Sequence, residues 1–76
     1  MINITATVDR IREILENESN AQLSEELNAF HSADLADIFQ ELKPEERLEC
    51  FNLIEEDKAA DMIEYLPPNL QVEILG

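Results

Sequence analysis

The chain has 76 residues, enough for one small domain, and we expect a single helical repeat domain over residues 1–76. Eighteen acidic residues against five basic ones give a formal net charge of −13. This charge excludes nucleic acid as an expected partner, because binding it requires Lys and Arg to neutralise phosphates. A hydrophobic fraction of 45% is too high for an acidic disordered tail, and a single cysteine excludes an internal disulfide.

The chain also lacks the patterns that direct a protein into a membrane. No apolar run approaches the roughly 18 residues that a bilayer-spanning helix needs. The segment Met1 to Arg12 has neither the basic start nor the apolar block of a signal peptide. We therefore expect this chain to be soluble and cytoplasmic, with no membrane insertion of its own.

Helical spacing dominates the first 30 residues. Thr7 is the predicted N-cap of a first helix, and Ser19 or Asn20 opens a second one after a polar turn. The apolar faces of these two helices are Val8, Ile11, Ile14 and Leu15, then Leu23, Leu27 and Phe30.

Prolines mark several of the predicted helix boundaries in the rest of the chain. Ser32 is the predicted cap of a third helix, which ends at Lys43-Pro44, and Pro44 starts a fourth helix because proline suits the first turn and not the interior. Glu56-Asp57 opens a fifth helix, and Pro67-Pro68 ends it and starts a sixth. Six short helices joined by two to four residues explain these breaks better than one long coiled coil, whose heptads would run without interruption.

A twelve-residue repeat runs through the second half of the chain. Its apolar columns are expected to form the core, and they are Ala36, Leu48, Ala60 and Val72; Ile38, Cys50, Met62 and Ile74; Phe39, Phe51, Ile63 and Leu75; and Leu42, Ile54 and Leu66. Each helix alone is marginal in water, so stacking must supply the stability. The repeat lacks a polar closing member, which predicts that the array continues in a longer protein.

The same repeat carries an acidic column, formed by Asp37, Glu49, Asp61 and Glu73. Asp37, Glu49 and Asp61 each have another carboxylate four residues away on the same helix, and a divalent cation would relieve the repulsion within such a pair. Magnesium needs only one or two carboxylates. The charges alone favour the simpler interpretation of a solvated helix face. Enzyme chemistry is not expected, because His31 and Cys50 are isolated and no glycine-rich loop could cradle a phosphate.

The run from His31 to Asp37, the step from Leu42 to Arg47, and the segments Lys58–Asp61 and Tyr65–Pro68 resemble the N-terminal domain of MgtE-type magnesium transporters. In that family the corresponding motifs read like His-Pro-Ala-Asp-Leu-Ala, Leu-Pro-Pro-Glu-Glu-Arg and an Ala-Ala step with an acidic residue. The resemblance covers about residues 8 to 75. Ser32 stands where the family has a proline after the histidine.

The resemblance implies an all-α, right-handed superhelical stack of the armadillo or HEAT kind. It also implies a magnesium sensor on the cytoplasmic side of the cell membrane, within a homodimeric full-length protein that has CBS domains and a membrane pore. Mg²⁺ would be shared, weakly, with CBS domains of the same polypeptide or of the dimer mate, and would hold the pore closed.

Three carboxylates are the candidate metal ligands under this resemblance. Asp61 matches the family's Ala-Ala-acidic step and is the first candidate, and Asp37 and Glu49 share its phase in the repeat. The alternative function is a helical protein–protein interaction module without sensing, similar to flagellar motor switch domains.

Overall fold

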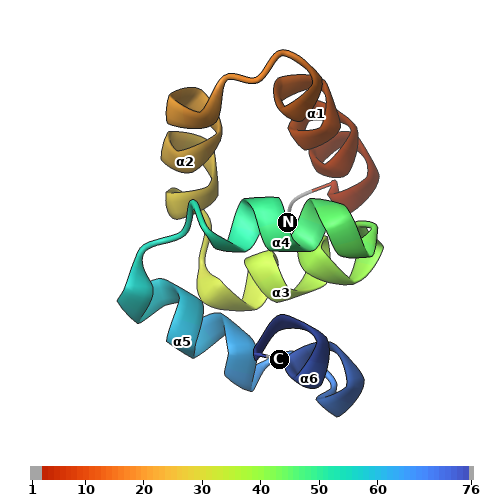
Figure 1. Ribbon diagram of the computed structural model, residues 1–76, viewed down its shortest axis with the longest axis vertical. Helices are drawn as coiled ribbons and strands as arrows, with labels where there is room; N and C mark the ends of the chain where they lie inside the picture. The colour runs from red at the N-terminus through yellow and green to blue at the C-terminus, as the bar shows by residue number, and fades with distance from the viewer. Residues whose placement is uncertain (1–2, 76) are drawn as a thin grey trace.

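The computed structural model describes residues 3–75, all of them in helices and short connections (Figure 1). The expected boundaries 1–76 therefore include Met1, Ile2 and Gly76, which lie outside the described residues. Six helices follow one another, with connections of two to four residues as predicted. They are α1 (Ile4–Glu16), α2 (Asn20–Asn28), α3 (Ser32–Glu41), α4 (Pro44–Phe51), α5 (Glu56–Glu64) and α6 (Pro68–Leu75).

The all-α fold class is confirmed over these residues, and none of the described helices is long and apolar enough to cross a membrane.

Two of the predicted helix caps are wrong, the first by four residues and the second by one. Helix α1 begins at Ile4 and not after Thr7, because the Asn3 side chain accepts a hydrogen bond from the Ala6 amide at 3.1 Å and caps the helix earlier. Helix α3 has His31 at the cap position, and Ser32 is already its first helical residue. The serine therefore sits where the family's proline would, at a first-turn position that suits proline.

The starts of α4, α5 and α6 are confirmed. Pro44 and Pro68 are each the first residue of their helix, where the missing amide proton costs no hydrogen bond. In α4, the Glu46 carboxylate accepts a hydrogen bond from the Lys43 backbone amide at 2.8 Å. This bond satisfies one of the amides that a helix start would otherwise leave without a partner.

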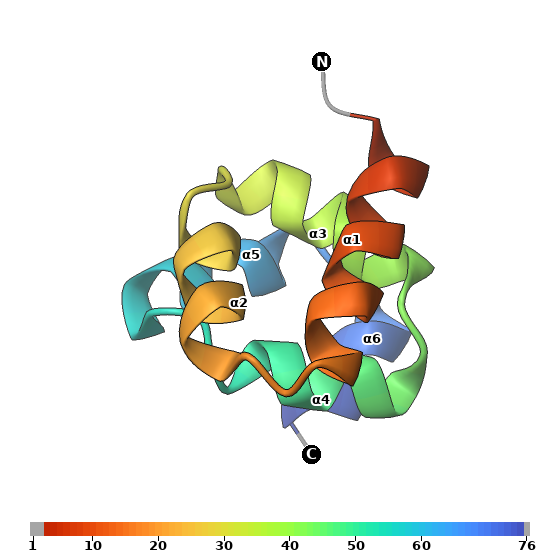
Figure 2. The same ribbon diagram turned by 90° about the horizontal axis from the view of Figure 1, so that it is seen from above.

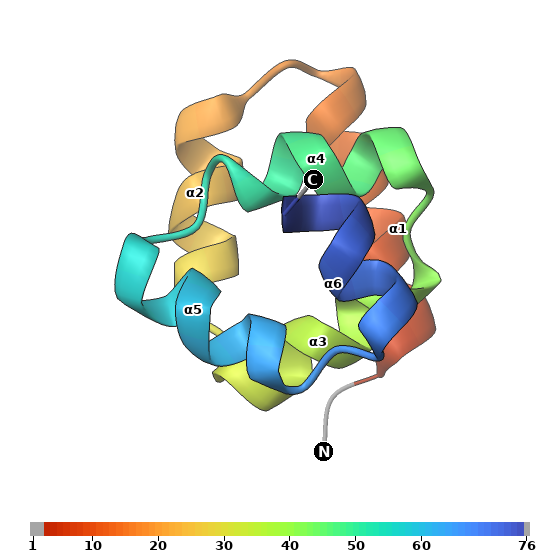
Figure 3. The same ribbon diagram turned by 60° about the horizontal axis from the view of Figure 1, so that its bottom comes forward.

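Helices that lie two apart in the chain pack against each other. α1 contacts α3 and α3 contacts α5, which makes one row, while α2 contacts α4 and α4 contacts α6, which makes a second row. Seen from above, α1 and α2 lie on opposite sides of the domain, and so do α3 and α4 (Figure 2). Seen from below, α6 lies beside α4 (Figure 3). This alternation is consistent with the stacked superhelix expected from the repeat, whose right-handed sense stays a prediction.

Helix α3 lies at the centre of the core. Four of its ten residues are buried, namely Leu35, Ala36, Ile38 and Phe39. Helices α1 and α5 cover α3 from two sides of the same row. The other large side chains that are fully buried are Ile11, Leu23, Leu27, Met62 and Cys50.

One of the four predicted core columns is wrong. Ala36 is buried, but Ala60 is exposed, and Leu48 and Val72 retain 47% and 70% of their accessible surface. The column one residue earlier points inward instead. It consists of Leu23, Leu35, Arg47, Ala59 and Gln71, which are buried or half-buried and each occupy the fourth position of their helix.

The two polar members of this inward column make equivalent bonds. Arg47 donates from Nε to the Phe39 carbonyl at 2.9 Å, and Gln71 donates from Nε2 to the Ile63 carbonyl at 2.9 Å. Each acceptor lies eight residues earlier, near the end of the preceding helix, where it also accepts one backbone amide, from Leu42 and from Leu66 respectively. These polar residues therefore replace an apolar core residue at no cost in unsatisfied groups.

Asn28 joins α2 to the connection between α4 and α5. Its amide nitrogen donates to the Leu53 carbonyl at 3.1 Å, and its amide oxygen accepts from the Glu55 amide at 2.8 Å. Lys58 of α5 donates to the carbonyls of Asn28 and Phe30 at 2.5 and 2.6 Å. The end of α2 is thereby fixed to the start of α5.

Glu18, in the turn between α1 and α2, has a backbone φ of 56°. This left-handed conformation costs a residue with a Cβ atom about 1–2 kcal/mol and costs glycine almost nothing. We expect Glu18→Gly to be more stable than Glu18→Ala by about 1 kcal/mol in urea unfolding, although both variants lose the same carboxylate. Equal stabilities of the two variants would contradict a left-handed Glu18.

Candidate functional site

The three carboxylates expected to bind metal are all exposed. Asp37 lies on α3, Glu49 on α4 and Asp61 on α5. Asp37 and Asp61 occupy the same phase on two helices of the same row that pack together, whereas Glu49 belongs to the other row. The structure therefore places Asp37 and Asp61 on neighbouring helices and separates Glu49 from them.

Asp61 lines an open depression between the end of α5 and the start of α3. The depression measures about 520 Å³, and its other walls come from His31, Ser32, Ala33, Glu64 and Tyr65. Asp61 and Glu64 are three residues apart and so lie on the same face of α5. Two carboxylates thus share one water-accessible hollow.

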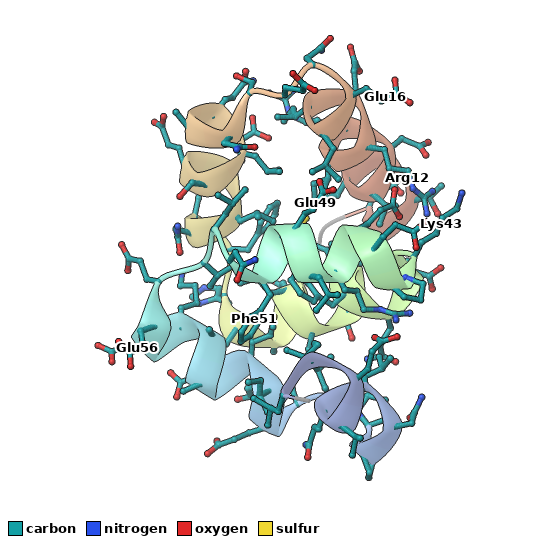
Figure 4. The ribbon with its side chains drawn as sticks, in the orientation of Figure 1. Arg12, Glu16, Lys43, Glu49, Phe51 and Glu56 are labelled. Atoms are coloured by element: carbon teal, nitrogen blue, oxygen red, sulfur yellow. The ribbon has the colours of Figure 1, made fainter. Side chains whose placement is uncertain are left out.

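Glu49 lines a different groove, of about 420 Å³, between α1 and α4. Figure 4 shows Glu49 and Lys43 projecting from the α4 side, and Glu16 and Arg12 from α1. Glu45 and Glu46 complete the charged wall of this groove. Glu49 therefore has two cations in its surroundings, which Asp61 does not have in its own depression.

No group of three His, Cys, Asp or Glu side chains in the described part of the chain is arranged to hold one metal ion. The donor chemistry nevertheless fits magnesium, which binds carboxylate oxygens, keeps several of its waters and usually takes only one or two carboxylates from a protein. Asp61 with Glu64, and Asp37 on the neighbouring helix, can each supply one such oxygen to a hydrated ion.

Most of the basic side chains are engaged within the domain. Arg10 pairs with Glu26, Arg12 with Glu46, and Arg47 with Glu73. Lys58 is bound to the two backbone carbonyls described above. Among the described side chains, only three of the eighteen acidic residues are thus held in ion pairs, and the rest contribute to a strongly negative surface.

The ion pairs connect segments that are remote in the chain. Arg12 and Glu46 are 34 residues apart, and their side chains meet across the groove at 3.0 Å. Burial of Glu46 opposes its ionisation, but hydrogen bonds from Arg12 and from the Lys43 amide outweigh burial and lower the pKa of the carboxyl. Sequence spacing offered no signal for this pair, because it depends on α1 packing near the start of α4.

His31 and Cys50 lie far from a reactive arrangement. His31 is exposed at the start of α3, as predicted. Cys50 is fully buried in the core, and burial is the main cause that raises the pKa of its thiol to about 12. The thiol is therefore protonated at neutral pH and acts as a small apolar residue, as its place in the repeat predicted.

The lowered pKa of Glu46 predicts a pH-dependent contribution to stability. A carboxyl whose folded pKa lies below its unfolded value stabilises the protein above the unfolded pKa and loses that effect as the pH falls through the folded pKa. We expect Glu46→Gln to lower the free energy of unfolding by about 1 kcal/mol at pH 7. The difference from the unmodified protein should shrink as the pH falls below the ordinary pKa of a glutamate, about 4.3, and through the lower folded pKa.

Glu45→Gln is the matched control, because Glu45 is the preceding first-turn residue of α4 and is exposed. Urea unfolding at each pH gives both differences. A pH-independent effect of Glu46→Gln, or an equal effect of Glu45→Gln, would show that the ionised Glu46 makes no specific contribution.

Comparison with known proteins gives one family. The model of the MgtE intracellular N domain matches residues 30–76, which is more than half of the chain and covers α3 to α6. No curated protein and no solved structure matches the chain. The resemblance expected from about residue 8 is thus confirmed from Phe30 onward, over the part that carries the twelve-residue repeat. The chain belongs to the family of the MgtE intracellular N domain, a part of MgtE-type magnesium transporters.

Proposed function

We propose that this domain regulates a magnesium transporter by sensing cytosolic Mg²⁺ through its exposed carboxylates. The observation that carries the proposal is the placement of Asp61, which is exposed in a hollow beside Glu64, within a domain that belongs to the MgtE family. The hollow is open to solvent, so a second domain can approach Asp61 and complete a coordination shell that the described residues do not complete alone.

The charge of the domain supplies the physical basis of the switch. With a formal charge of −13, the domain repels any other acidic surface. Cations that neutralise Asp61, Asp37 and Glu49 reduce this repulsion and favour the state in which the domain is docked. Because the ion binds the docked state better than the separated one, rising Mg²⁺ shifts the equilibrium toward docking.

The docked partner in this proposal is a CBS domain, from the same polypeptide or from its dimer mate, and the docked state holds the pore closed. The domain then lies on the cytoplasmic side of the membrane within a homodimer. Asp61 is the first ligand, Asp37 on the neighbouring helix is the second, and Glu49 contributes from the separate groove. No catalytic step is involved.

The proposal predicts weak and localised Mg²⁺ binding by this chain. In a titration followed by amide chemical shifts, we expect Mg²⁺ to shift residues around Asp61 and Glu64 most, because they share the depression. Asp61→Asn should abolish these shifts. Asp9→Asn, an identical change at an exposed position on α1, should leave them intact.

Sodium at matched ionic strength separates binding from screening. Shifts spread evenly over all acidic residues, or reproduced by sodium, would mean that the surface attracts cations without a site at Asp61.

The regulatory role is tested in the complete transporter polypeptide that carries this domain, reconstituted in vesicles. Asp61→Asn should weaken the closure of the pore at high Mg²⁺ and raise the concentration that half-closes it by about tenfold, which corresponds to a coupling of about 1.4 kcal/mol. Asp9→Asn should transport as the unmodified protein does. Normal closure in the Asp61 variant would refute the sensing role of this residue.

A further inference from the structure

The ammonium group of Lys58 on α5 is held by backbone carbonyls and not by a carboxylate. It donates to the carbonyls of Asn28 and Phe30 at 2.5 and 2.6 Å, and it joins none of the ion pairs found over residues 3–75. Asp61 follows Lys58 by three residues, a spacing at which opposite charges on a helix are neighbours. The two carbonyls thus hold the charge of Lys58, and the Asp61 carboxylate has no ion pair within this range.

The end of α2 is a favourable place for this cation. Asn28 is the last residue of α2, and the carbonyls of a last helical turn have no amide partner within the helix. The negative end of the helix dipole lies at the same point and attracts a positive charge. Lys58 is half-buried there, so the two bonds form a fixed connection between α5 and the end of α2.

These two bonds join the walls of the depression that contains Asp61. One wall is the later part of α5, with Asp61 and Glu64, and the other is the start of α3, with His31 and Ser32. Phe30 directly precedes His31, so its bond to Lys58 fixes the connection from which the second wall begins. Helices α3 and α5 pack together along one row, and Lys58 adds a bond at the end where the depression opens (Figure 1).

The second wall matters for a magnesium ion because the ion keeps several of its waters. Those waters donate hydrogen bonds, and the Ser32 hydroxyl in the wall opposite the carboxylates is an acceptor for one of them. Water-mediated binding of this kind is sensitive to the distance between the walls, because a displacement of about 1 Å is enough to loosen a site.

We propose that Lys58 is a positioning residue of the cation site at Asp61, an inference that rests on the sensing function proposed above. Lys58 fixes the α2–α3 connection to α5 and keeps Ser32 opposite Asp61. A role through charge alone has the opposite sign. A positive charge near Asp61 opposes the binding of a cation, so its removal would tighten binding, whereas the loss of positioning weakens it.

Lys58→Met separates the two roles, because methionine has a similar unbranched stem without the charge or the donors. In a Mg²⁺ titration of the 76-residue chain followed by amide shifts, we expect the dissociation constant at Asp61 and Glu64 to rise at least about threefold. Lys58→Arg keeps the charge and the donors and should bind within about twofold of the unmodified protein. Lys43→Met removes the same charge at an exposed position before α4 and should not weaken binding.

The position of the second wall is measured without any metal ion. In Mg²⁺-free buffer, Lys58→Met should shift the amide resonances of His31 and Ser32, and Lys58→Arg should shift them less. Circular dichroism checks that each variant is folded. If Lys58→Met does not fold, Lys58→Gln, which keeps an amide donor and lacks the charge, is held to the same two expectations.

Two results would overturn the proposal. Binding of Mg²⁺ by Lys58→Met that equals or exceeds that of the unmodified chain would leave Lys58 with a role through charge or with none. Unmoved resonances at His31 and Ser32 would show that the packing of α3 on α5 alone sets the wall. Failure of the sensing function looks different, because the unmodified chain itself would then lack localised shifts at Asp61, and both proposals would fall.

Discussion

The length of the helices is the constraint on which the rest of this structure depends. Five of the six helices have only eight to ten residues, and helices of that length are unstable alone in water. Each one must therefore bury part of its surface against a neighbour. Helix α3 does so most completely, because α1 and α5 cover it from both sides of its row. The helices are stable only when they are stacked. Equivalent surface residues therefore recur every twelve positions along the chain.

The repeat predicted the helices well because prolines and first-turn acids are local signals. Pro44, Glu56 and Pro68 begin helices in the structure, as their residue types indicate. The packing direction was harder to predict. A column of Ala36, Leu48, Ala60 and Val72 looks like core, yet the inward position belongs to the residue before each of them. That column was missed because it contains the polar residues Arg47 and Gln71, which interrupt an apolar pattern in the sequence. Their hydrogen bonds to backbone carbonyls allow both side chains to face inward.

The arrangement of the candidate site also could not be predicted from the sequence alone. Sequence spacing identified Asp37, Glu49 and Asp61 as one acidic column, and all three are exposed. It could not show that Glu49 belongs to the other row of helices, in a groove that also contains Arg12 and Lys43. The three-residue spacing of Asp61 and Glu64 places both on one face of α5, but the sequence could not show that they border a depression beside α3. These relations depend on how the rows pack, which is information between helices and not within them.

The distribution of charge follows from the same packing. The five basic residues are few, and most of them serve to connect helices, so they cannot balance the carboxylates on the outer surface. The ion pairs between helices therefore help to hold the fold together, while the unpaired carboxylates repel other acidic surfaces. A domain built in this way can remain folded while its surface responds to the ions and partners around it.

The paired bonds of Arg47 and Gln71 indicate how such a domain can change its length during evolution. The two residues are 24 positions apart, as are the helix-starting prolines Pro44 and Pro68. The unit that repeats these two bonds is thus a pair of helices and not the twelve-residue step. Duplication or loss of one pair preserves the alternation of the two rows, whereas loss of one helix would exchange the rows of all the helices that follow it.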